Sequence, residues 1–254
     1  MNILKNKGYS VQKNVFTKAE ILKFEKNLIF FIFKFCKKKH RKISNKARLI
    51  LDYKEYEFRL GAIKLLEYIE MKNKTLFYEI SKECTNFHLI NYVDQNKKIQ
   101  SVVKKFFGKN YNVVQRKKPI MLFNKKNLSR LKYLWHQESQ FYPNHRLGLH
   151  IWFPVFRNVK SNNDGGIIFA LNGFKKNYKF SETKLKNGWT QRVPKIDVEK
   201  EFQLFSPEIN RGDVIFFIGP QLHRSDEQRN NIPRVSFVIR YLSDIYDGAF
   251  KPIE

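Results

Sequence analysis

Two residues near the middle of the chain have the types and the spacing of metal ligands. The string Leu134-Trp135-His136-Gln137-Glu138 places an imidazole and a carboxylate two positions apart. Residues i and i+2 of a β-strand project to the same face, so a strand here would point His136 and Glu138 at one position. Both belong to the 2-His-1-carboxylate set, which binds non-haem Fe(II) and leaves coordination positions open. We therefore expect the third ligand to be a histidine from a later strand.

His223 is the best candidate for that third ligand. It follows a Gly-Asp turn and the apolar run Val214–Ile218, 85 residues after Glu138. Eleven residues later Arg234 opens another apolar segment, and its guanidinium offers a two-pronged donor for a dicarboxylate. A His-x-Glu pair alone occurs by chance in many chains. The pair followed by a distal histidine and a strand-initial arginine is much more specific, and it predicts a metal centre with Arg234 beside it.

Two regions of different periodicity would have to position these side chains. Residues 1–108 are mostly helical in pattern, with a capping-box signature at Thr17 and Glu20 and apolar residues at helical spacing from Ile99 to Phe106. Residues 109–254 contain short β-branched and aromatic runs separated by Asn, Asp, Gly and Pro. These runs predict strands at Tyr111–Val114, Ile120–Phe123, Tyr133–Gln140, Leu147–Pro154, Gly166–Ala170, Asp213–Ile218 and Arg234–Leu242.

This order of elements predicts one α+β domain over residues 1–254. Its core would be mainly β, an antiparallel sandwich or jelly roll, with the helical N-terminal part packed on one side. Strand parity places His150 on the same face as Trp152, and Arg240 and Ser236 on the same face as Arg234. His150 and Arg240 are therefore candidate substrate contacts. The alternatives are a structural role for His150 and a rival anion-binding role for Arg240.

The net charge of the chain bears on which kinds of molecule it could bind. The 254 residues include 49 Lys and Arg against 23 Asp and Glu, a formal net charge of +26. Such a charge is solvated surface, or attracts an anionic partner, or both. Residues 34–48 hold eight Lys or Arg and no acid. This segment favours a solvated helix face and leaves open an anionic substrate or carrier, nucleic acid or a membrane surface. The chain lacks a zinc finger, an RNP motif and a recognition-helix pattern, which argues against nucleic acid.

Cysteine usage and hydropathy indicate a cytoplasmic, soluble protein. Two cysteines, Cys36 and Cys84, cannot build a disulfide framework. The apolar run Leu28–Phe33 is far shorter than the roughly 20 residues of a membrane span. It is followed by basic residues in place of a signal-peptide cleavage site. We expect no transmembrane segment, and only a weak contact with a membrane surface stays open.

Several further strings accompany the proposed ligands along the chain. They are Gly8–Val11, Val15–Ile21, Pro119–Lys125, Phe141-Tyr142-Pro143 after His136-Gln137-Glu138, Trp152–Val155, Asn163–Gly166, and Gly212-Asp213 with His223-Arg224-Ser225 and Pro233-Arg234. Together these strings resemble the phytanoyl-CoA dioxygenase-like branch of the Fe(II)/2-oxoglutarate-dependent oxygenases, over nearly the whole chain. The departure is Glu138, where that family usually has Asp. A carboxylate is retained, which argues against halogenation, because halogenating relatives have a small residue there.

The resemblance implies a double-stranded β-helix, the cupin-like jelly roll. It implies Fe(II) bound by His136, Glu138 and His223, and 2-oxoglutarate held by Arg234. Ser225 and Trp152 match positions that contact the cosubstrate in that family, although Trp152 could equally be a core residue. The implied activity is O2-dependent hydroxylation with release of succinate and CO2.

The substrate is less defined by the sequence than the reaction. Basic and aromatic residues in Phe141–Arg146 and Phe174–Lys200 fit an anionic small molecule or a carrier-linked metabolite. They are equally consistent with a mobile, solvated lid that has no specific ligand. Two other functions stay open. One is a zinc-dependent hydrolase that uses the same three ligands. The other is a non-catalytic basic binding module on the same fold, which would bind an anionic polymer.

Overall fold

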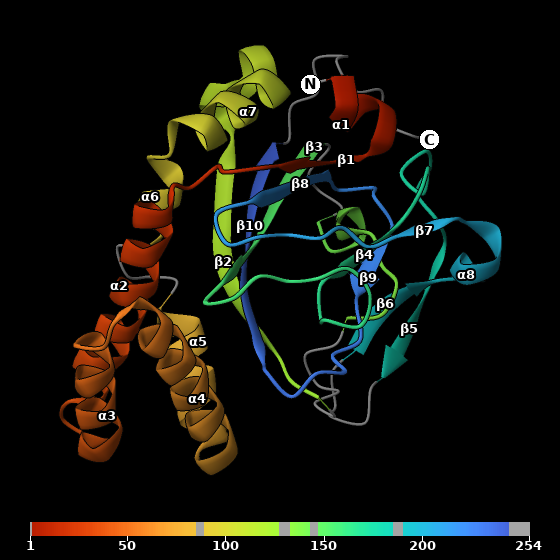
Figure 1. Ribbon diagram of the computed structural model, residues 1–254. Helices are drawn as coiled ribbons and strands as arrows, with labels where there is room; N and C mark the ends of the chain where they lie inside the picture. Colours follow the sequence, from red (N-terminus) through yellow and green to blue (C-terminus); the bar gives the residue numbers. More distant parts are fainter. Residues whose placement is uncertain (1, 85–88, 127–132, 143–146, 185–189, 244–254) are drawn as a thin grey trace.

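The computed structural model describes residues 2–84, 89–126, 133–142, 147–184 and 190–243. Figure 1 shows a helical part beside two antiparallel sheets. The larger sheet has the order β1-β8-β3-β10-β2 and the smaller one the order β7-β4-β9. The strands of the larger sheet are, in that order, Tyr9–Gln12, Val214–Ile218, Leu147–Val155, Arg234–Ser243 and Gln115–Asn124. Those of the smaller sheet are Leu204–Phe205, Ile167–Ala170 and His223–Ser225. β5 (Phe180–Lys184) and β6 (Thr190–Pro194) form a separate hairpin.

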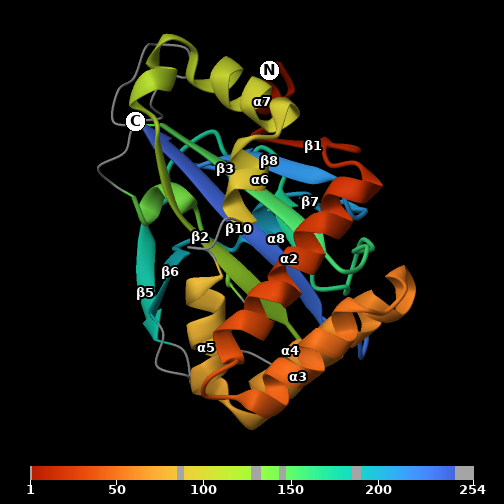
Figure 2. The ribbon, with the colours of Figure 1, turned by 90° about the vertical axis from the view of Figure 1, so that its left-hand side faces the viewer.

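In the described part of the chain, seven α-helices precede β2, and α2 to α5 cover one face of the larger sheet (Figure 2). The capping box predicted at Thr17 begins α2: the Glu20 backbone N–H donates to the Thr17 hydroxyl, and the Glu20 carboxylate accepts from the Thr17 backbone. The helices are α1 Asn2–Lys7, α2 Lys18–Cys36, α3 Arg41–Leu51, α4 Glu55–Lys72, α5 Lys74–Glu83, α6 Leu89–Asp94 and α7 Lys97–Phe107. The short helix α8 spans Val198–Glu201.

Alternate residues of the larger sheet serve two different environments. In β3, Leu149, Ile151 and Phe153 belong to the core shared with the helices, where Phe153 lies 5.6 Å from Phe24 of α2 between ring centroids. Trp152 belongs to a second core, between the two sheets. β8 and β10 alternate in the same way. The period of two that the sequence predicts therefore separates a helix-facing side from a side that faces the smaller sheet.

A buried ion pair attaches the helical part to the strands. Glu25 of α2 is fully buried and accepts from Arg211 at two points, Nε to Oε1 and Nη2 to Oε2, each at 2.8 Å. The same carboxylate accepts from the backbone N–H of Phe156, which follows β3. Paired with a guanidinium and an amide, the buried carboxylate avoids the large cost of an isolated buried charge. It fixes α2 at one position along the sheet.

Two strands expected from the sequence are wrong. Tyr111–Val114 is not a strand, because α7 is capped by Gly108, with a positive φ of 56°, and a 3-10 helix over Gly108–Val113 follows. The mostly helical first part contains the strand β1, which covers most of the string Gly8–Val11 and pairs with β8. The segment 133–140 is not a strand either: it makes one bridge, at His136, and then a 3-10 helix over Glu138–Gln140. Within the described residues, no helix is both long and apolar enough to cross a membrane.

Candidate metal centre

The two proposed histidine ligands are placed side by side by their own backbones. The His136 N–H donates to the carbonyl of His223 at 3.0 Å, and the His223 N–H donates back to the carbonyl of His136 at 3.1 Å. Residues paired in this antiparallel way present their side chains as neighbours. The imidazole centroids are accordingly 4.2 Å apart. His223 is the first residue of β9, so the smaller sheet holds one histidine and, through this bridge, positions the other.

The same nitrogen of each imidazole is engaged by a backbone carbonyl. Nδ1 of His136 lies 2.7 Å from the carbonyl oxygen of Leu134, and Nδ1 of His223 lies 2.8 Å from that of Gln221. A carbonyl oxygen only accepts, so each Nδ1 carries the proton and each Nε2 keeps its lone pair for a metal. Burial lowers the pKa of both histidines, well below the ordinary value for His223. Both rings are therefore neutral, the state in which imidazole binds metals.

Glu138 completes a cluster of three buried ligands. One ligand atom each from His136, Glu138 and His223 lie within 4.8 Å of one another. Burial alone would raise the pKa of Glu138, but the charge of Arg240 and then that of His150 hold the pKa well below its usual range. The carboxylate is therefore ionised before any metal binds. Two neutral imidazoles and a carboxylate suit a borderline divalent ion such as Fe(II) or Zn(II).

Gln137 explains how this cluster is held without a strand. Its side chain points away from the ligands and is completely buried. Its Nε2 donates to the carbonyls of Lys176 and Pro220 at 2.8 and 2.5 Å, and its Oε1 accepts from the N–H of Tyr178 at 2.9 Å. These bonds join the ligand segment to two loops that are distant in sequence. They replace the ladder of hydrogen bonds that a regular strand would have supplied.

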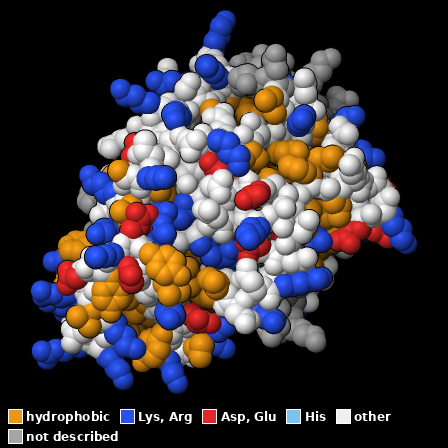
Figure 3. Space-filling model, in the orientation of Figure 1, with side chains coloured by type: hydrophobic (Ala, Val, Ile, Leu, Met, Phe, Trp, Pro, Cys, Tyr) orange, Lys and Arg blue, Asp and Glu red, His pale blue; other side chains and the backbone are white. Residues whose placement is uncertain are grey.

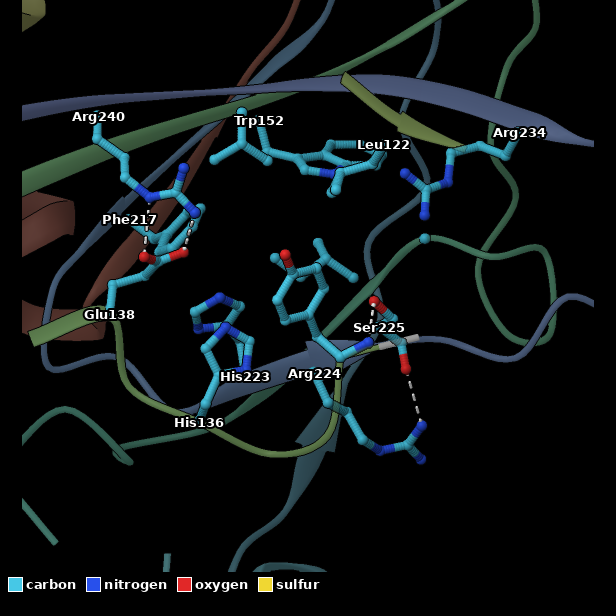
Figure 4. A pocket seen from close by; sticks show the side chains of 14 residues that line it. Leu122, His136, Glu138, Trp152, Phe217, His223, Arg224, Ser225, Arg234 and Arg240 are labelled. Carbon is cyan, nitrogen blue, oxygen red and sulfur yellow. Dashed lines mark hydrogen bonds and ion pairs between the residues drawn. The ribbon is translucent and has the colours of Figure 1, made fainter. Parts of the chain in front are cut away.

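Arg234 lies at the opposite end of the cavity from Glu138 (Figure 4). Its side chain is 1% exposed, its Nη1 donates to the hydroxyl of Ser236, and its guanidinium carbon lies 5.4 Å from the ring centre of Trp152. Nε has no hydrogen-bond partner, and the guanidinium makes no ion pair with any described residue. Burial, followed by the charge of Arg157, lowers its pKa to about 9. Among the described residues, Asp164 and Asp226 raise the pKa of Arg234 by their charge, but neither forms an ion pair with it. A buried cation of this kind fits an added carboxylate.

The other residues proposed from the sequence have varied surroundings. Ser225 and Trp152 line the cavity, and the Ser225 hydroxyl accepts from the backbone N–H of Tyr133 at 3.2 Å. Arg240 also lines the cavity, but its guanidinium is paired with Glu138. His150 lies behind Glu138, with Nδ1 4.0 Å from Oε2 and its ring stacked on Phe217, and it is not among the residues that line the cavity. The structure therefore places His150 and Arg240 around the carboxylate.

Sequence reasoning missed several residues of the cavity wall. Tyr133 contributes a half-buried side chain whose ring centroid lies 5.4 Å from that of His136, and desolvation raises its pKa. Its position three residues before His136 gave no indication of this. Strand parity could have found Val238, which lies on β10 two residues from Arg240 and four from Arg234. The other lining residues gave no such signal, because Arg224 lies between two proposed residues and the remaining three are on strands without one. These three are Leu122, Ile167 and Phe217.

The loops expected to contact substrate are described in part. In 174–200, the β5–β6 hairpin carries Arg192, which donates to the carbonyl of Gln140 and lies 5.0 Å from the ring centre of Phe180. This contact connects the hairpin to the segment that carries Glu138. The remaining parts of the two loops, residues 143–146 and 185–189, lie outside the described residues.

Comparison with known proteins finds similarity in structure alone. No protein-family model matches the chain, and no curated protein matches it in sequence. HygX from Streptomyces hygroscopicus, solved with nickel and 2-oxoglutarate, superposes with a TM-score of 0.54 at 10% identity, over 96% of this chain and 86% of its own. EctD from S. alaskensis, solved with bound Fe, gives 0.53 at 12% identity, over 95% and 75%.

EvdO2 from Micromonospora carbonacea var. aurantiaca gives a TM-score of 0.53 at 13% identity over 64% of this chain. The chain spans only 65% of the length of EvdO2. At these identities the similarity shows a shared fold. It is a mixed helical and antiparallel fold in which HygX and EctD bind a metal ion.

Proposed function

We propose that this chain is an Fe(II)- and 2-oxoglutarate-dependent oxygenase, with His136, Glu138 and His223 as the metal ligands. The observation that carries the proposal is Arg234. This buried guanidinium lacks an anionic partner among the described residues and lines the same cavity as the three ligands. A cavity with a metal-binding cluster at one end and an unpaired cation at the other fits a dicarboxylate that reaches from one to the other.

Each residue of the site would have a separate role. His136 and His223 present neutral Nε2 atoms, and Glu138 presents an ionised carboxylate. Arg234 binds the distal carboxylate of 2-oxoglutarate, with Ser225 and Trp152 on the walls beside it. Bound Fe(II) would supply the O2-dependent oxidation, coupled to conversion of 2-oxoglutarate to succinate and CO2. The largely apolar wall around the ligands, with Leu122, Phe217 and Val238, excludes water from them.

The finer assignments rest on sequence resemblance together with this fold. We take the two sheets as a double-stranded β-helix, residues 1–254 as one domain, and the phytanoyl-CoA dioxygenase-like branch as the family that the sequence resembles. We propose hydroxylation of an anionic small molecule or carrier-linked metabolite. Arg224, which lines the cavity and is paired with the exposed Glu199 at 3.2 Å, supports a negatively charged substrate.

The two alternative functions account for less of the site. A zinc hydrolase would use the same ligands but gives no reason for the unpaired Arg234 in the same cavity. A basic binding module would need a continuous cationic surface. Figure 3 shows Lys and Arg spread over much of one face of the molecule, with acidic side chains among them, as in a solvated surface. The binding module also gives no reason for two histidines and a carboxylate to be buried together.

The test is an anaerobic titration of the metal-free protein with Fe(II), followed by 2-oxoglutarate and then O2. We expect one Fe(II) per chain and slow, Fe(II)-dependent formation of succinate, which a library of anionic metabolites would accelerate when it contains the substrate. Zn(II) in place of Fe(II) is the matched control and should give no succinate. Stoichiometric metal binding without 2-oxoglutarate binding would contradict the proposal and favour the hydrolase.

A further inference from the structure

Arg240 and Glu138 form a two-point ion pair inside the cavity. Nε of Arg240 lies 2.9 Å from Oε2, and Nη2 lies 2.9 Å from Oε1 (Figure 4). Both residues are buried, at 6% and 4% exposure. Arg240 belongs to β10 and Glu138 to the 3-10 helix after the histidine bridge. The pair therefore connects the larger sheet with the segment that supplies two of the three proposed ligands.

The ion pair restricts the orientation of the Glu138 carboxylate, which would otherwise be variable because the side chain is long. A glutamate has one more rotatable bond than an aspartate, so its carboxylate has more orientations to lose when it binds a metal. The guanidinium fork holds both carboxylate oxygens, which removes that freedom beforehand. Each oxygen has two lone pairs, and the fork occupies one of them on each. One lone pair per oxygen stays available for a metal while the fork is intact.

The surroundings of Arg240 keep its guanidinium in place. On the neighbouring strand β3, His150 is the residue paired with Arg240. His150 is 1% exposed, and its Nδ1 lies 4.0 Å from Oε2 of Glu138. The pairing of β10 with β2 shifts register between Val238 and Arg240, which is the irregularity of a β-bulge. Bulges commonly redirect a side chain near a functional site. Phe217 of β8 is paired with His150 in the strand register, and its ring stacks on the imidazole.

We propose that Arg240 is a positioning residue that fixes the carboxylate of Glu138 where it meets Nε2 of His136 and His223. In this role it sets the affinity of the site for a divalent metal. The inference rests on the proposed function only in requiring that these three residues bind a metal. It also predicts that an Asp at position 138, which is one methylene shorter, meets the fork and the two imidazoles together less well than Glu138 does.

The experiment is a double-mutant cycle read by metal affinity. Wild type, Arg240→Met, Glu138→Asp and the double variant are titrated anaerobically with Fe(II), and with Co(II), whose visible spectrum reports the ligand geometry. Residues that orient a metal ligand are typically worth about 10- to 100-fold in metal affinity. We expect a loss of that size from each single substitution. The double variant should lose clearly less than the product of the two, because the second substitution removes a contact that is already broken.

Two further variants distinguish the geometry of the Arg240 guanidinium from its charge, and from a general loss of stability in the sheet. Arg240→Lys keeps the charge but lacks the fork, so it should remain weakened, with an altered Co(II) spectrum. Arg116→Met removes another ion-paired arginine of the same sheet, paired with Asp94 outside the cavity, and should leave metal affinity unchanged. Should Arg240→Met fail to fold, Glu138→Asp and Arg240→Lys still test the inference.

The possible outcomes are distinguishable. Wild-type affinity in Arg240→Met, full recovery in Arg240→Lys, or losses that simply multiply would each overturn the positioning role while leaving the proposed function intact. A wild-type protein that binds no divalent metal would instead overturn the proposed function.

Discussion

The imidazoles of His136 and His223 are neighbours because the two residues exchange a pair of backbone hydrogen bonds, at 3.0 and 3.1 Å. The residues are 87 positions apart in the chain. Main-chain pairing does not depend on the identity of the side chain. A substitution of either histidine should therefore remove a metal ligand without removing the bridge that holds the segment.

His223→Ala tests the metal centre. We expect metal affinity to fall by more than about 100-fold, since even groups that only orient a ligand are worth about 10- to 100-fold. The backbone bridge should keep the fold, so the far-ultraviolet circular dichroism of the metal-free protein should match wild type. Isothermal titration with Co(II) under argon gives the affinity. Unchanged affinity would remove His223 from the ligand set.

Arg234→Ala tests the cosubstrate site. Hydrogen bonds to charged groups contribute roughly 1.5–3 kcal/mol, which corresponds to a loss of about 10- to 150-fold in 2-oxoglutarate affinity. Metal affinity in the absence of 2-oxoglutarate should barely change. The matched control is Arg229→Ala, an exposed arginine shortly before β10 that pairs with Glu227. A 2-oxoglutarate titration that shows equal affinities for the two variants would contradict this role for Arg234.

Gln137→Glu tests how the ligand segment is held. The substitution keeps the shape of the side chain but places a carboxylate oxygen against the carbonyls of Lys176 and Pro220, where an N–H now donates. An unsatisfied buried group of this kind costs about 1–3 kcal/mol, more if charged. Urea unfolding should show at least that loss. Gln203→Glu, at an exposed position after α8, is the control and should change stability by less than about 0.5 kcal/mol.

The stability of the metal-free protein should decrease as the pH is lowered, because the folded protein keeps His150 neutral. Burial lowers the pKa of His150 to about 4, from a reference value of 6.5. Between these two values the unfolded chain takes up a proton that the folded protein does not, so stability is full above about pH 6.5 and is lost toward pH 4. A shift of this size corresponds to about 2–3 kcal/mol between pH 7.5 and 4.5.

Urea unfolding at several pH values, in a chelating buffer, measures this loss. His150→Gln should reduce the difference between pH 7.5 and 4.5 by that amount, whereas His40→Gln, on the outer helical part, should not. An equal pH dependence in His150→Gln and wild type would exclude His150 as its source.

The sequence by itself determined which side chains share a face on each long strand. Side chains in β3 and β10 alternate between two faces, so parity alone places His150 with Trp152 and Arg234 with Arg240. Parity did not determine which of them reach the cavity, because Trp152 lines it and His150 does not. The start of α2 was equally local: Thr17 and Glu20 satisfy each other's backbone groups within one turn. Strand alternation and helix capping depend on residues that are close in sequence, so they can be predicted without knowing how the rest of the chain packs.

Only the tertiary structure decided how the ligand segment is built and what Arg240 does. The segment 133–140 has a strand-like composition, but it meets β9 at a single bridge, and the hydrogen bonds of Gln137 to distant loops form its remaining support. Parity placed Arg240 on the correct face but could not give its partner, which lies 102 residues away in sequence. Whether a buried arginine meets a carboxylate, as Arg240 does, or none among the described residues, as with Arg234, depends on distances that only packing fixes.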